Sequence, residues 1–138
     1  MLFGLLLGLL FHIQAQGIPG SFRYSYRMNE GLSLLSVRAI CQDSKGYMWI
    51  ATRNGLNRYD GEDYTVYRED PEDSLSLADN DIFALAEEKG HALWICTGRG
   101  INRLCQRTDR FRRYQEDKGL SNSTFQTICV DRSGRVWA

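Results

Sequence analysis

Three tryptophans divide this chain into units of nearly equal length. Trp49, Trp94 and Trp137 are 45 and 43 residues apart, and alignment on them brings similar residues into register. Six positions before each tryptophan lies an acid, in the order Asp43, Glu88 and Asp131. Three and six positions after the first two tryptophans lie a threonine and a glycine, namely Thr52 with Gly55 and Thr97 with Gly100. Such a period is typical of repeat architectures, in which each unit buries its apolar faces against the next.

Each unit predicts four short strands. In the first unit they cover 37–42, 47–52, 56–59 and 64–67, and are separated by turns rich in Asp, Asn and Gly. Runs of β-branched and aromatic residues between such turns are typical of antiparallel hairpins. Residues 75–88 could begin as a helix, but their repeat partners are loop and strand. We therefore predict a loop followed by a strand there.

Four strands in every 43 to 45 residues match the length of a β-propeller blade. A single four-stranded sheet cannot bury both of its faces, whereas blades stacked around an axis can. We predict an all-β fold of four-stranded antiparallel blades forming an incomplete arc of about two and a half blades. The predicted blades cover 35–78 and 79–120, and a third, truncated blade covers 121–138. Because the chain stops one residue after Trp137, we expect it to be a fragment of a longer protein.

The N-terminal segment is predicted to lie outside this repeat. Residues 1–13 are almost wholly apolar, yet shorter than the roughly 20 residues that a membrane-spanning helix needs. We predict a signal peptide over 1–16, although no Lys or Arg precedes the apolar run. A buried N-terminal helix is the alternative. Residues 17–34 then form a lead-in, in which Phe22–Tyr26 is a candidate strand for closing the ring.

Charge and cysteine content exclude several classes of function. Lys plus Arg and Asp plus Glu are 17 each, so the chain has no net charge to attract nucleic acid. The four cysteines show neither a CxxC pair nor a histidine at ligand spacing, so we predict no metal site and no cofactor. An exported chain can form disulfides, and the sequence leaves open whether Cys41, Cys96, Cys105 and Cys129 do so.

The aligned units carry a recognisable motif. The first copy reads Asp43-Ser-Lys-Gly-Tyr-Met-Trp-Ile-Ala-Thr-Arg-Asn-Gly-Leu-Asn-Arg-Tyr59, the second runs from Glu88 to Leu104, and the third starts at Asp131. It resembles the two-component regulator propeller repeat, although Ala51 and Cys96 replace the usual glycine after Trp-Ile. The resemblance implies the N-terminal periplasmic sensor part of a hybrid two-component histidine kinase of the Bacteroidetes type. It further implies an oligosaccharide ligand, signalling across the membrane to transcription, a membrane helix downstream of this chain and possible homodimers.

Recurrence separates structural residues from binding candidates. The recurring tryptophans are predicted to pack between blades rather than to stack on sugars, and the recurring acids to hold turns rather than to act in catalysis. Arg58 and Arg103 also recur, and we expect them to pack their stems on the sheet and extend to solvent. Non-recurring residues of the turns between the second and third strands are the candidate ligand contacts: Arg53, Asn54 and Arg99. A role as solvated loop residues is the alternative for these three.

Two other functions remain open at this stage. One is a secreted propeller enzyme acting on polysaccharides, since a fold alone does not exclude catalysis. We predict no catalytic residues in this chain, because no Ser/His/Asp set or phosphate-binding loop is visible. The other is a non-catalytic propeller that binds proteins.

Overall fold

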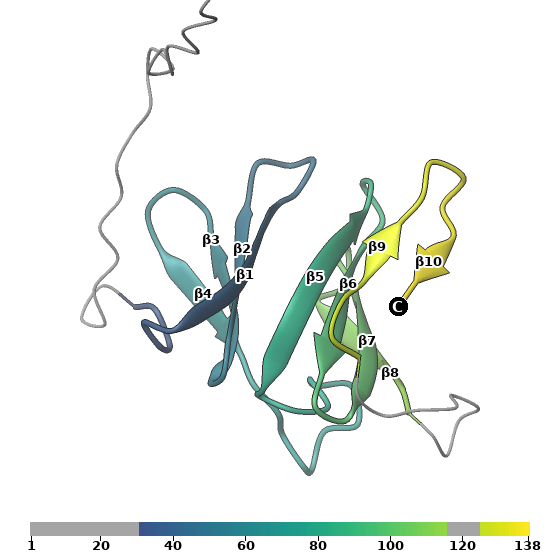
Figure 1. The fold of residues 1–138 in the computed structure, drawn as a ribbon. Coiled ribbons are helices and arrows are strands. Elements are labelled where there is room, and N and C mark those ends of the chain that lie inside the picture. The colour runs from purple at the N-terminus through teal and green to yellow at the C-terminus, as the bar shows by residue number, and fades with distance from the viewer. Residues whose placement is uncertain (1–30, 116–124) are drawn as a thin grey trace, which may run out of the picture.

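The computed structural model describes residues 31–115 and 125–138. The predicted signal peptide and the candidate strand Phe22–Tyr26 lie outside the described residues. Within the described ranges the regular secondary structure consists of β-strands, without a helix (Figure 1). The predicted all-β class is confirmed.

The strands form two four-stranded antiparallel sheets and a third, two-stranded one. The first sheet has the order β1 (Val37–Gln42), β2 (Met48–Thr52), β3 (Gly55–Tyr59) and β4 (Tyr64–Tyr67). The second has the order β5 (Ile82–Glu88), β6 (Ala92–Thr97), β7 (Gly100–Cys105) and β8 (Arg110–Tyr114). The third pairs β9 (Cys129–Val130) with β10 (Val136–Trp137). The predicted four-strand unit is thus present twice, and the segment 75–88 is a loop followed by β5, as predicted.

The two complete sheets share one register. Trp49 lies opposite Arg58 on β3, and Trp94 lies opposite Arg103 on β7. The pairing of β1 with β2 shifts between Val37 and Ala39, and that of β5 with β6 shifts at the equivalent point. The sequence repeat is therefore a repeat of backbone geometry.

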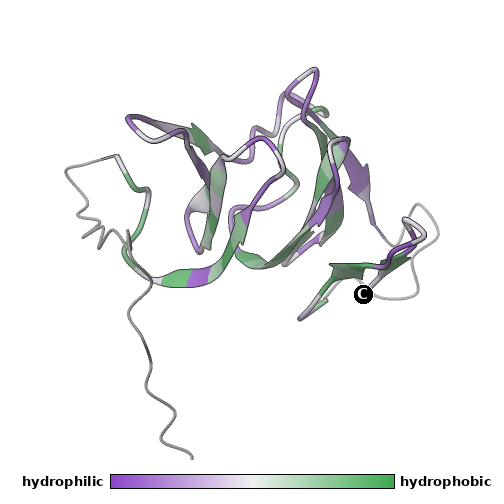
Figure 2. Ribbon diagram, turned by 90° about the horizontal axis from the view of Figure 1, so that it is seen from above, coloured by the Kyte–Doolittle hydropathy of each residue, from purple (hydrophilic) through white to green (hydrophobic). Residues whose placement is uncertain are grey.

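Neighbouring sheets pack face to face. β1 contacts β5, and β5 contacts β9, so the first strands of successive sheets lie next to one another (Figure 1). Trp49, Ala51 and Leu56 of the first sheet share one buried cluster with residues that precede or belong to the second, namely Leu77, Ile82, Leu93, Ile95, Leu104 and Phe111. Figure 2 shows apolar colour along parts of the strands, and polar colour on other parts and in many of the turns. Burying these faces is what stabilises stacked blades.

Each repeat contains a hydrogen bond from its tryptophan to its acid. Trp49 Nε1 donates to Asp43 Oδ2 at 2.8 Å, and the equivalent distances at Glu88 and Asp131 are both 3.1 Å. The other oxygen of Asp43 accepts the backbone N–H groups of Lys45 and Tyr47 at 2.9 and 3.0 Å. Because a buried indole N–H needs a partner, one carboxylate both shapes the turn and satisfies the tryptophan.

A buried asparagine fixes the segment that leads into each complete sheet. Asn57 Oδ1 accepts the N–H of Ser33 at 2.9 Å, and Asn102 Oδ1 accepts that of Ala78 at 3.0 Å. Both asparagines are fully buried, and they occupy equivalent places in β3 and β7. Their carboxamides therefore attach the incoming chain to the middle of the sheet.

Arg58 and Arg103 pack on the sheet, and their side chains remain 24% and 30% exposed. The Arg58 guanidinium lies 5.8 Å from the ring centre of Trp49 and 3.5 Å from a carboxylate oxygen of Asp109. That of Arg103 lies 5.7 Å from the ring centre of Trp94 and 3.2 Å from Glu88. The aromatic face and the carboxylate together attract the cation, so the charged end stays on the sheet.

Replacing Asp43 tests the carboxylate's role. Asp43→Ala leaves the buried indole N–H of Trp49 and two turn N–H groups without their acceptor, so we expect the free energy of unfolding to fall by about 3 kcal/mol. Urea denaturation followed by tryptophan fluorescence measures this.

Asp131→Ala is the matched control, because Asp131 makes the same type of bond to a tryptophan that is 56% exposed. Water can replace the acceptor there, and we expect a loss of about 1 kcal/mol or less. Equal losses in the two variants would contradict the role given to Asp43.

Candidate functional site

The candidate ligand residues lie at one end of the sheets, beside the connection between β4 and β5. Gly55 N, in the turn between β2 and β3, donates to the carbonyl of Asn80 at 2.9 Å. Gly98 N, in the turn between β6 and β7, donates to the carbonyl of Asp81 at 3.0 Å. The two ends of this connection, 68–69 and 79–81, therefore lie beside the turns. We call this surface the turn face.

Threonine and glycine set the shape of both turns. Thr52 Oγ1 donates to the carbonyl of Gly55 at 2.9 Å, and Thr97 Oγ1 donates to that of Gly100 at the same distance. The φ angles of the two glycines are +110° and +118°, which side-chain-bearing residues rarely adopt. The repeated residues thus form a rigid frame for the side chains between them.

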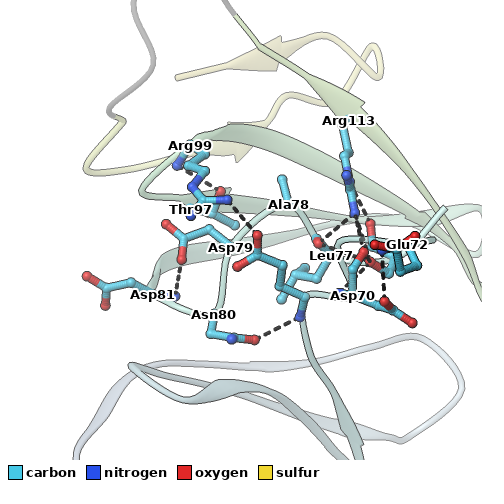
Figure 3. A network of polar contacts seen from close by, with 12 residues as sticks. Asp70, Glu72, Leu77, Ala78, Asp79, Asn80, Asp81, Thr97, Arg99 and Arg113 are labelled. Carbon is cyan, nitrogen blue, oxygen red and sulfur yellow. Dashed lines mark hydrogen bonds and ion pairs between the residues drawn. The ribbon is translucent and has the colours of Figure 1, made fainter. Parts of the chain in front are cut away.

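Arg113 holds the connection in place. Its Nη2 donates to the carbonyls of Asp73 and Leu77 at 2.9 and 3.0 Å, and its Nε donates to that of Ser76 at 3.0 Å (Figure 3). Near the turns, Asn80 Oδ1 accepts the N–H of Glu69 at 2.8 Å. The acids of the connection are therefore presented by an ordered backbone.

Arg99 pairs with one of these acids. Its Nη1 forms an ion pair with Glu69 Oε1, drawn in Figure 3, and its backbone N–H donates to Thr97 Oγ1 at 3.3 Å. The side chain is still 60% exposed. A ligand could contact both members of this pair.

Arg53 has a weaker partner. Its Nε is 3.7 Å from Asp81 Oδ1, which also lies 3.0 Å from Arg38 Nη1. The Arg38 guanidinium is stacked 4.4 Å from the ring centre of Phe83. The structure thus brings Arg53 together with three residues that the sequence analysis did not select.

Asn54, the third candidate, is already engaged by the protein. Its Nδ2 donates to the carbonyl of Ser33 at 3.1 Å, and its own carbonyl accepts Arg68 Nε at 3.2 Å. Of the three candidates, Arg53 and Arg99 therefore present the polar groups that remain most accessible.

One signal in the sequence could have identified Arg38 and Phe83. Both stand eleven positions before the tryptophan of their unit, and Gln126 stands at the equivalent place in the third unit. Arg, Phe and Gln differ in kind at a position flanked by similar residues. Variation within a fixed frame is what a binding surface on a repeat scaffold requires.

The cysteines differ in reactivity. All four are free thiols in the structure. Hydrogen bonds from the Thr108 hydroxyl and from the backbone N–H groups of Arg107 and Thr108 lower the pKa of Cys105 to about 7, whereas burial raises the pKa of Cys96 to about 11. Within 31–115 and 125–138, no group of three or more His, Cys, Asp or Glu is placed to hold a metal ion.

Part of this chain matches a known protein family. Residues 31–54 match the model of the two component regulator propeller family. This chain carries a two-component regulator propeller repeat. The match includes Asp43 and Trp49, which are hydrogen-bonded to each other, and Thr52, which shapes the turn between β2 and β3.

A curated relative and a solved structure extend the likeness of this propeller. The chain is 46% identical to histidine kinase P4 of Formosa agariphila over 54 residues. These residues are 39% of this chain and 4% of that protein. It is similar to the extracellular domain of BT4673 from B. thetaiotaomicron, at 27% identity and a TM-score of 0.65 over 77% of this chain and 16% of that one. A second structure of BT4673, described as a hybrid two component system, gives 26% identity and a TM-score of 0.64. This propeller chain therefore spans a small part of the length of the proteins it matches.

The frame glycines can be tested directly. A Cβ on Gly55 would lie 2.6 Å from the carbonyl oxygen of Tyr67, whereas a Cβ on Gly61 would meet nothing within 4 Å, although both glycines have φ near +110°. We expect Gly55→Ala to lower the free energy of unfolding by about 2 kcal/mol more than Gly61→Ala, because only the first adds a backbone clash to the strain of positive φ. Urea denaturation of the two variants gives the difference, and equal losses would contradict the account.

Proposed function

We propose that this chain supplies blades of the exported sensing propeller of a two-component-type regulator, and that its turn face takes part in binding an oligosaccharide. The observation that carries the proposal is the likeness to the extracellular domain of BT4673, together with the propeller repeat at 31–54. The export signal predicted over 1–16 supports a periplasmic location.

The signalling part belongs to the proposal as well. The likeness to histidine kinase P4 supports a complete protein in which a kinase follows the propeller. In such a protein a membrane helix links the two, and two copies associate. Within the described ranges, no helix is long and apolar enough to cross a membrane.

The chemistry of the turn face suits a saccharide. Sugar hydroxyls both donate and accept hydrogen bonds, and a guanidinium beside a carboxylate offers both kinds of partner. Arg99 with Glu69 forms one such pair, and Arg53 with Asp81 forms another at the junction of the first two sheets. Arg99, Glu69 and Asp81 lie on backbone that is itself hydrogen-bonded, which lowers the cost of ordering these residues on binding.

Calorimetry on the exported region of the intact gene product tests this function. We expect at least one member of a panel of defined oligosaccharides to bind, and Arg99→Ala to weaken that binding about tenfold, since a charge-assisted hydrogen bond is lost. Arg110→Ala is the control, because Arg110 lies on β8, is similarly exposed and pairs with Asp73 at 3.3 Å. It should leave the affinity unchanged.

Two results would contradict the proposal. Cleavage of a polysaccharide by the purified protein would favour a secreted propeller enzyme. Failure of every oligosaccharide to bind, with capture of a protein partner through the turn face, would favour a protein-binding propeller.

A further inference from the structure

Three charged side chains meet at the junction of the first two sheets. Asp81 Oδ1 is shared by Arg38, at 3.0 Å, and Arg53, at 3.7 Å. A single carboxylate between two guanidiniums leaves one positive charge in this group. The longer distance exceeds that of a hydrogen bond, and the Arg53 side chain is 63% exposed. Arg53 is therefore the member of the group that can take another acidic partner.

The arrangement is also built to hold its shape. Arg38 on β1 is 25% exposed and stacks on Phe83 of β5, so its guanidinium bridges the two sheets. The N–H of Asp81 donates to Asp79 Oδ1 at 3.2 Å, which orients the start of β5. Phe83 packs against a second buried cluster, which consists of Cys96, Ile101 and Ile128. Arg38 and Asp81 are thus held by the two sheets, and Arg53 lies beside them on the exposed turn between β2 and β3.

Neither arginine serves the repeat itself. At the position equivalent to Arg53 the second unit has Gly98, and at the position equivalent to Arg38 it has Phe83. The second sheet nevertheless has the same strand order and register as the first. The fold therefore does not require a guanidinium at either place.

The other acids of the turn face leave this charge accessible. Glu69 is paired with Arg99. Asp79 carries a further carboxylate on the side of the second turn: its Oδ1 accepts the N–H of Asp81, and its Oδ2 lies 2.5 Å from where a Cβ on Gly98 would be. Arg53 lies on the first turn and its side chain is 63% exposed, so an acidic group can reach its guanidinium.

We propose that the turn face selects an acidic saccharide, whose carboxylate or sulfate group is bound by Arg53 with support from Arg38. This inference rests on the proposed function and names the ligand class for the same site. A planar guanidinium matches the two oxygens of a carboxylate or sulfate ester, and such charge-assisted bonds are stronger than those to a neutral hydroxyl. The aromatic ring beneath Arg38 holds that guanidinium in place beside the site.

The test compares saccharides that differ only in the acidic group. The exported region of the intact gene product is titrated with galacturonate and galactose trimers, with mannuronate and mannose trimers, and with sulfated and unsulfated galactose trimers. We expect an acidic trimer to bind about tenfold more tightly than its neutral partner, and this preference to shrink as salt is added. Comparing the uronate trimers with the sulfated trimers shows whether the site binds a carboxylate or a sulfate group.

Two variants assign the preference to Arg53. Arg53→Gln should remove the preference for the acidic trimer, whereas Arg110→Gln, on β8, should retain it. Circular dichroism and urea denaturation confirm that both variants are folded.

The outcomes separate this inference from the proposed function. Tighter binding of neutral trimers, or a preference that survives in Arg53→Gln, would overturn the inference and leave a saccharide-binding propeller. Failure of all acidic and neutral trimers to bind would overturn both.

Discussion

The hydrogen bond between an acid and a tryptophan six residues later organises each unit of this fold. It joins the turn after the first strand to the middle of the second, and in the first unit it does so on a side chain that is 1% exposed. The carboxylate of Asp43 also connects the two sheets, because its Oδ2 accepts a hydrogen bond from Gln106 Nε2, next to β7, at 3.2 Å. One acid therefore links the turn, the apolar core and the neighbouring blade.

The buried asparagines extend this organisation to the connections between blades. Asn57 and Asn102 bind the backbone that enters their sheet, and Arg113 binds the carbonyls of the connection from the far side. The connection is thereby ordered, and its carboxylates stand beside the turns that carry Arg53 and Arg99. Packing of the frame and placement of the candidate site thus have the same origin.

Most of the frame could be predicted from the sequence, because strand periodicity and turn glycines are local signals that the repeat shows more than once. The positive φ at Gly55 and the strand after residue 75 are examples. The partners of Arg58 and Arg38 could not be predicted, since Asp109, Asp81 and Phe83 reach them only after two sheets have stacked. The position of a residue within the repeat predicts its backbone conformation. It does not predict which residue of the neighbouring sheet its side chain contacts.

Hydrogen exchange of the three indole N–H groups, followed by NMR on tryptophan-labelled protein, tests the central claim most directly. The account predicts the slowest exchange at Trp49, whose bond to Asp43 is 2.8 Å long and buried, then Trp94, and the fastest at the exposed Trp137. Exchange of the Trp49 indole as fast as that of Trp137 would contradict the claim that the acid–tryptophan bond organises the blade.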